Sequence, residues 1–207
     1  MTSIAIPHEL AAALRHAGAR ERMEVLLRHF DGSLEWFRAL GRHWSTCDTI
    51  GLHRHQVANV LSRATPEQRL AMMEAVELAT WATLPPVFTV WRGAHAVNAD
   101  GLSWSLDREV AARFPFLPGY ARQGEAPLLL TGCVRRSDCI LKLDRRESEI
   151  IAPRVQIVDR RHLVHDARPE ATPPITPPAV RPSVAARAAA LLRAVLSGDR
   201  GNPEAVA

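Results

Sequence analysis

Three short polar motifs lie in a fixed order in the second half of the chain, each beside an apolar run. They are Val90-Trp91-Arg92-Gly93, Gly101-Leu102-Ser103-Trp104-Ser105 and Arg146-Glu147-Ser148-Glu149-Ile150-Ile151. Residues 87–91 are rich in β-branched and aromatic side chains and predict a strand that carries Arg92 at its end. Gly93 beside it leaves room for a ligand to approach the backbone closely.

The serines of the second motif and the glutamates of the third are each spaced two residues apart. On an extended chain this spacing points both members of a pair to the same face. Ser103 and Ser105 therefore form one pair, and Glu147 and Glu149 form another. An arginine, two hydroxyls and two carboxylates together suit a phosphate-bearing ligand that develops positive charge during reaction.

This order of motifs resembles the mono-ADP-ribosyltransferases of the arginine, serine, glutamate class. The resemblance implies that Arg92 holds the phosphates of NAD, that Ser103 supports the nicotinamide ribose, and that Glu149 is the catalytic glutamate. It implies that Glu147 holds or deprotonates an arginine acceptor. The other residues expected at the NAD site are Gly93, Trp104 and Ser105. NAD is then a substrate, and no metal is expected.

The resemblance covers residues 87–158, which is less than half of the chain. Two departures from the family stand within it. Trp104 occupies the middle of the serine motif, where the family usually has threonine. The separation between Arg92 and Glu149 is short for the family, which implies trimmed loops around the nicotinamide.

The mechanism implied by the resemblance follows from charge. Breaking the bond between nicotinamide and ribose leaves an oxocarbenium-like sugar, and a carboxylate beside the ribose stabilises that transition state more than the ground state. Glycoside hydrolases use carboxylates against the same kind of cation. Glu149 is expected in this role, with the planar fork of Arg92 on the pyrophosphate.

Composition sets the outer limits on class. The chain has 207 residues, of which 47% are hydrophobic, and a mass of 22.9 kDa, enough for one good core. No run approaches the roughly 20 apolar residues of a membrane span, and the start of the chain does not resemble a signal peptide, so a cytoplasmic protein without membrane contacts is expected. The three cysteines lack metal-type spacing and predict neither a disulfide framework nor a zinc site.

The net charge of +4 is a modest excess for a nucleic-acid-binding protein. Lys142 is the only lysine, and every other strong base is arginine. This skew indicates coding bias rather than a basic patch selected for binding. The resemblance implies a protein acceptor, with a nucleic-acid acceptor as the alternative.

The predicted fold class is α+β. A helical lobe is expected over residues 1–84, with helical spacing over 10–30 and 34–44, and a capping box at Thr65-Pro66-Glu67-Gln68 that opens a helix to about Trp81. A split, mostly antiparallel β core of ADP-ribosyltransferase type is expected over 85–167, with a helix capped by Asp107. A Pro-rich linker over 168–182 and a C-terminal helix within 183–207 follow.

Two other function classes stay open. An NAD glycohydrolase would need Arg92, Ser103 and Glu149 but no acceptor site. A non-enzymatic module would bind DNA or protein through its helices, and residues 36–63 have the pattern of a helix-turn-helix around Gly51. By analogy with the family, the enzyme would be a bacterial toxin-like or phage-encoded effector.

Overall fold

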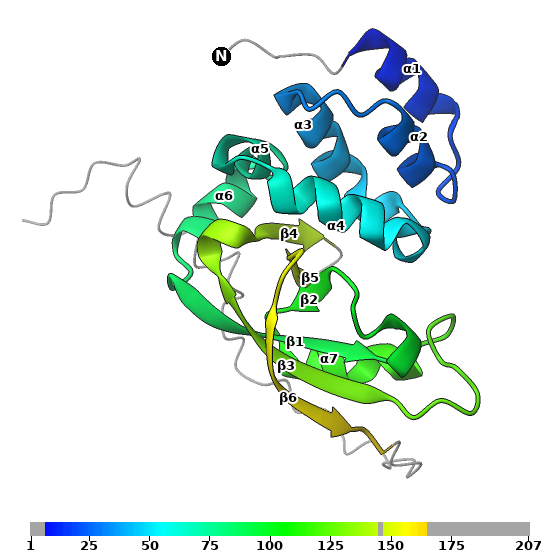
Figure 1. Ribbon diagram of the computed structural model, residues 1–207, viewed down its shortest axis with the longest axis vertical. Helices are drawn as coiled ribbons and strands as arrows, with labels where there is room; N and C mark the ends of the chain where they lie inside the picture. Colours follow the sequence, from blue (N-terminus) through cyan, green and yellow to red (C-terminus); the bar gives the residue numbers. More distant parts are fainter. Residues whose placement is uncertain (1–6, 145–146, 165–207) are drawn as a thin grey trace, which may run out of the picture. The chain divides into compact units, whose positions relative to one another are not determined.

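In the computed structural model, which describes residues 7–144 and 147–164, helices fill the first half of the chain (Figure 1). Six α-helices follow one another, with two 3-10 turns between the third and the fourth. Their bounds are α1 (His8–His16), α2 (Arg22–Arg28), α3 (Leu34–His43), η1 (Trp44–Thr46), η2 (Ile50–His53), α4 (Arg54–Arg63), α5 (Pro66–Ala71) and α6 (Ala75–Ala82). Among the described residues no helix has the length and apolar character to cross a membrane.

The helical pattern predicted over residues 10–30 is interrupted between α1 and α2. Two backbone carbonyls of the interruption are held by a distant loop: Ala19 accepts from the Asp48 amide at 3.0 Å, and Arg20 accepts from the Thr49 hydroxyl at 2.9 Å. These tertiary bonds fix a turn at a point where the helical periodicity of the sequence continues without a break. The predicted single helical stretch is therefore two short helices.

The capping box at Thr65 is confirmed, with the Thr65 hydroxyl accepting from the Gln68 amide at 3.2 Å. The helix that it opens ends at Ala71 and does not run to Trp81. The Met72 carbonyl accepts from the Lys142 ammonium at 3.2 Å, so this carbonyl is bonded outside the helix. A second capping box at Glu74 then starts α6.

The connection between α3 and α4 differs from that of a helix-turn-helix, which has a turn of about three to four residues. Here η1, η2 and the residues around them separate the two helices. Val57 and Leu61 of α4 are buried in the core. These two side chains therefore belong to the packing of the lobe.

Six strands form one sheet in the second half of the described chain. They are β1 (Val87–Ala94), β2 (Ser103–Ser105), β3 (Leu128–Arg135), β4 (Ile140–Asp144), β5 (Glu147–Ile151) and β6 (Gln156–His162). Their order across the sheet is β4-β5-β2-β1-β3-β6, and every pair is antiparallel. The predicted α+β class, with helices before an antiparallel sheet, is confirmed.

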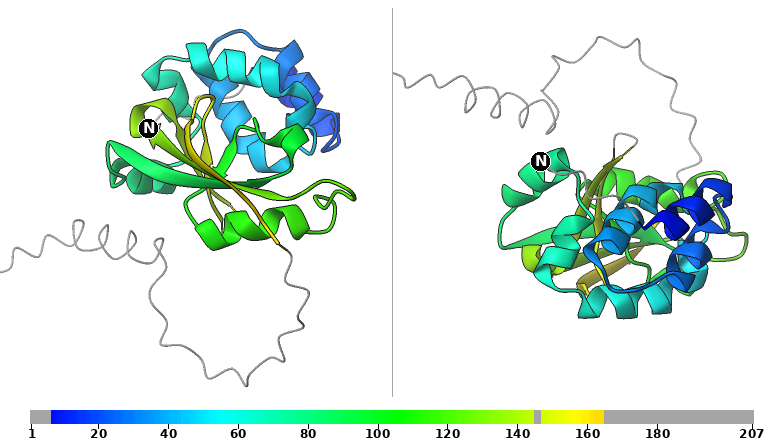
Figure 2. Two further views of the ribbon diagram at one scale, coloured as in Figure 1. Left: turned by 60° about the horizontal axis from the view of Figure 1, so that its bottom comes forward. Right: turned by 90° about the horizontal axis from the view of Figure 1, so that it is seen from above.

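One helix interrupts the strands. Helix α7 (Arg108–Arg113) follows β2 and packs on β1, and Asp107 caps it by accepting from the Glu109 and Val110 amides at 2.7 and 3.1 Å. This confirms the predicted cap. The N-terminal helices gather next to β4 and β5 (Figures 1 and 2), where α6 contacts β4.

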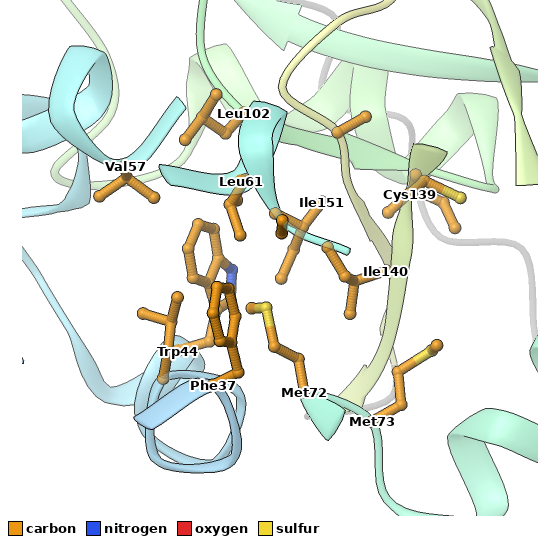
Figure 3. Close-up of a cluster of buried hydrophobic side chains, with 14 of the residues drawn as sticks. Phe37, Trp44, Val57, Leu61, Met72, Met73, Leu102, Cys139, Ile140 and Ile151 are labelled. Carbon is orange, nitrogen blue, oxygen red and sulfur yellow. The ribbon is translucent and has the colours of Figure 1, made fainter. Parts of the chain in front are cut away.

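The helices and the sheet share one hydrophobic core within a compact unit of residues Met1–Asp166. In Figure 3 the side chains of Phe37, Trp44, Leu61 and Met72 from the lobe lie beside Ile140 and Ile151 from the sheet, in one buried cluster. The lobe therefore completes the core beneath β4 and β5. The predicted linker and C-terminal helix lie outside the described residues.

The only lysine of the chain joins the lobe to the sheet. The Lys142 ammonium on β4 donates to the Glu77 carboxylate on α6 at 2.7 Å, with both side chains about 5% exposed. The same carboxylate accepts from the Leu143 amide at 3.0 Å and the Glu74 amide at 2.8 Å. A buried charge needs such a full set of partners.

Candidate functional site

The three polar motifs come together on three neighbouring strands. Strand β1 carries Arg92 and Gly93, β2 carries the serine motif Ser103–Ser105, and β5 carries Glu147 and Glu149. The order across the sheet at this point is β5-β2-β1. Motifs far apart in the sequence are thus adjacent in space.

Glu149 lies directly opposite Ser105 in the pairing of β5 with β2, and Ser105 lies opposite Trp91 in the pairing of β2 with β1. Residues opposite one another in an antiparallel ladder project from the same face. The carboxylate is half-buried, and its Oε1 accepts a hydrogen bond of 3.0 Å from the indole Nε1 of Trp44. Trp44 comes from the helical lobe and is 1% exposed, so its indole is a rigid donor.

Trp44 was not among the residues predicted for the site. It lies far before the motifs in the sequence, at the end of α3, in a stretch whose pattern indicates only core packing. Its contact with Glu149 exists because the lobe packs on β5. No local spacing in the sequence carries that information.

The two serines have different surroundings. Ser103 lies opposite Ile151, whereas Ser105 lies opposite Glu149. The Ser105 hydroxyl accepts from the Asp107 amide at 3.0 Å and so also shapes the turn into α7. The resemblance gives the ribose contact to Ser103, but the register puts Ser105 nearest in the ladder to Glu149.

Trp104, between the serines, points away from Glu149. It lies opposite Ile150, and it is only 4% exposed. Its ring approaches Gly132 of β3, where a side chain would come within van der Waals contact. The indole therefore packs against the face of the sheet opposite to that of Glu149.

The Arg92 guanidinium binds backbone carbonyls of the segment between β1 and β2. Its Nε and Nη2 donate to the Asn98 carbonyl at 3.3 and 2.9 Å, and its Nη1 donates to the Ser103 carbonyl at 2.5 Å. Of the five N–H donors of an arginine, these bonds leave one on each Nη for a ligand.

Burial lowers the pKa of Arg92, while the nearby carboxylates of Glu149 and Asp100 oppose that shift. The charge of Arg92 therefore interacts with that of Glu149. By alternation along β1, however, the Arg92 side chain leaves the strand on the side shared with its ladder partner Leu130. Glu149 shares its side of the sheet with Ser105 and Trp91.

Two glycines make this arrangement sterically possible. A Cβ at Gly101 would overlap the Arg92 guanidinium, so the loop can close over the arginine only with glycine there. A Cβ at Gly93 would overlap the Ala111 carbonyl and the Pro115 ring, so Gly93 admits α7 against β1. The sequence suggested Gly93 for ligand approach, and the structure gives it a packing contact.

Glu147 stands at the start of β5, with its backbone opposite Asp144. Its role toward an acceptor stays a prediction.

A cavity of about 650 Å³ lies apart from Glu149. Its walls come from the segment after β1, from Leu130 of β3, and from the residues on either side of the turn between β5 and β6. Of the seven predicted site residues only Trp104 lines it. Gly101 also lines it, which places the clamped Arg92 behind that wall.

None of the three cysteines forms a disulfide, and burial raises the pKa of the Cys47 thiol to about 11 and that of Cys139 to about 12. In the parts of the chain that the structure describes, no group of three or more His, Cys, Asp and Glu side chains could hold a metal ion.

Comparison of the chain with protein-family models, with curated proteins and with solved structures gave no match.

Proposed function

We propose that the chain is an NAD-dependent mono-ADP-ribosyltransferase that moves ADP-ribose from NAD to an arginine of a protein acceptor. One observation carries the proposal: the arginine, serine and glutamate motifs occupy adjacent strands, and Glu149 stands opposite Ser105.

Glu149 is the proposed catalytic residue. As nicotinamide leaves, positive charge develops on the ribose, and a carboxylate fixed in place stabilises that charge without having to reorganise. Trp44 supplies the fixing contact, because its buried indole holds Oε1 while Oε2 has no hydrogen bond to another described residue. Ser105 lies beside Glu149 in the ladder, and we propose that it orients the ribose together with Ser103.

Arg92 is proposed as a positioning residue, because its side chain leaves β1 on the side of the sheet opposite to that of Glu149. Its bonds to Asn98 and Ser103 hold the segment that leads into the serine motif. Loss of Arg92 is therefore expected to weaken NAD binding by loosening the serine motif.

The decisive test measures nicotinamide release from NAD by the parent protein and by Glu149→Gln. The glutamine keeps the shape of the side chain and removes its charge, so the rate should fall by about a hundredfold or more. Glu109→Gln on α7 is the matched control, because the Glu109 side chain is 83% exposed and its only ion pair with a described residue is at 4.0 Å. A parent protein that cleaves no NAD, or a fully active Glu149→Gln, would refute the proposal.

Transfer is separated from hydrolysis with Glu147→Gln. The acceptor guanidinium would lose the carboxylate that positions it and takes its proton, so labelling of arginine should cease while slow NAD hydrolysis continues. The measurement follows nicotinamide release and incorporation of labelled ADP-ribose in parallel. Arginine labelling equal to that of the parent would mean that the acceptor is a different group.

A further inference from the structure

The 650 Å³ cavity has a strongly cationic lining. Arg54, Arg154 and Arg160 border it together with one carboxylate, Asp100. The negative charge of Asp100 is balanced by Arg54, which donates a 2.8 Å hydrogen bond to its carboxylate. Burial alone would raise its pKa, but this bond and the charge of Arg54 lower it, so the carboxylate stays ionised at neutral pH.

Two of the three cations have no counterion among the described residues. Neither Arg154 nor Arg160 forms an ion pair or a hydrogen bond with another described residue. With Arg54 and Asp100 cancelling, they leave two uncompensated positive charges on the cavity wall. Like charges at one wall repel unless an anion lies between them.

The shape of β6 places Arg160 at the cavity. The pairing of β3 with β6 shifts between Thr131 and Gly132, so that β6 has one extra residue at this point. A bulge of this kind turns side chains that would otherwise alternate toward one side. Ile157 and Arg160, three residues apart, consequently both line the cavity, while Arg161 next to them does not.

The rest of the lining is mostly apolar. Leu130, Val155 and Ile157 contribute wall beside the arginines. A volume of about 650 Å³ lies within the range of roughly 300 to 1,000 Å³ that small-molecule sites occupy. The cavity has room for an organic group attached to the anion.

We infer that this cavity binds a nucleotide-sized organic diphosphate, with Arg154 and Arg160 on the phosphates and the organic part against Val155 and Ile157. Two uncompensated cations match the charge of a diphosphate better than that of a single carboxylate, and arginine is suited to phosphate oxygens. This site goes beyond the proposed function, because it needs neither Glu149 nor any bond cleavage.

The test titrates ADP into the parent protein and its variants by calorimetry. Arg154→Ala and Arg160→Ala should each weaken ADP binding by about tenfold, which corresponds to about 1.4 kcal/mol. Arg161→Ala is the control for net charge, since it removes one positive charge from the neighbouring residue. Arg161 pairs with Asp159 at 2.6 Å and does not line the cavity, so this variant should leave the affinity within about twofold of the parent's. Thermal unfolding of each variant verifies that the fold is intact.

Two results would overturn the inference. One is a parent protein that binds no ADP at millimolar concentration. The other is an equal loss of affinity in Arg160→Ala and Arg161→Ala, which would indicate attraction by net charge alone. NAD cleavage by the parent, measured separately, tests the proposed transferase, so either proposal can fail while the other stands.

Discussion

Removing Glu77 from its buried ion pair with Lys142 should lower the free energy of unfolding more than removing Lys142 does. Lys142→Met keeps the length of the side chain and removes its charge. The Glu77 carboxylate would then keep two donors, the Leu143 and Glu74 amides. Glu77→Leu would instead leave the ammonium with one acceptor, the Met72 carbonyl, and would strip both amides of theirs.

The magnitudes follow from these counts. Removing one partner of a buried pair costs about 3 to 5 kcal/mol of unfolding free energy. Each buried donor left without an acceptor adds about 1 to 3 kcal/mol. Lys142→Met should therefore lie near the lower end of the first range, and Glu77→Leu should exceed it by about 2 kcal/mol or more.

The assay is urea unfolding of the parent, the two single variants and the double variant Lys142→Met/Glu77→Leu. The double variant buries no charge, so its cost should be smaller than the sum of the two single costs, with a coupling energy of about 1 to 3 kcal/mol. Equal costs for the two single variants would refute the donor count. Strict additivity would show that the pair does not act as a unit.

Three further predictions concern the site and the thiols. Trp44→Phe should lower the rate of nicotinamide release about tenfold, because Glu149 loses its indole donor. Trp36→Phe is the control, because the Trp36 indole donates to the Leu26 carbonyl at 2.7 Å and not to Glu149. This variant should lower stability but leave the rate of the folded protein unchanged. Gly101→Ala should displace Arg92 and weaken NAD binding, measured by calorimetry, while Gly51→Ala, which has open space for a Cβ, should not. Burial raises the thiol pKa of Cys47 to about 11 and that of Cys139 to about 12, so both thiols should stay protonated at pH 8 and react with a thiol reagent only after unfolding. Rapid labelling of all three cysteines in the native protein would contradict the burial of Cys47 and Cys139.

Local signals in the sequence predicted local structure well. The capping residues Thr65 and Asp107 begin helices where expected, because a cap is a contact between near neighbours. Strand β1 overlaps the run over residues 87–91 that predicted it. Helix ends were less predictable, since α5 ends where a lysine from β4 takes the Met72 carbonyl.

In the candidate site, too, local features were predictable from the sequence and long-range contacts were not. The spacing of Ser103 with Ser105 and of Glu147 with Glu149 indicated paired side chains on extended chain, and both pairs lie on strands. Which serine stands opposite Glu149 depends on the register between β2 and β5, and the sequence has no marker for that register. The contacts of Trp44 and of Gly101 arise only once distant segments pack together.

The burial of the single lysine has a consequence for chemical modification. Enzymes and reagents that act on side-chain amines, such as acetylating enzymes, ubiquitin ligases and amine-reactive cross-linkers, find one such amine in this sequence, and it is about 5% exposed. While α6 and β4 stay together, that amine is shielded by Glu77 and Met72. Lys142 therefore reports on unfolding: amine labelling of this side chain, or cleavage by a lysine-specific protease, measures how often the lobe separates from the sheet.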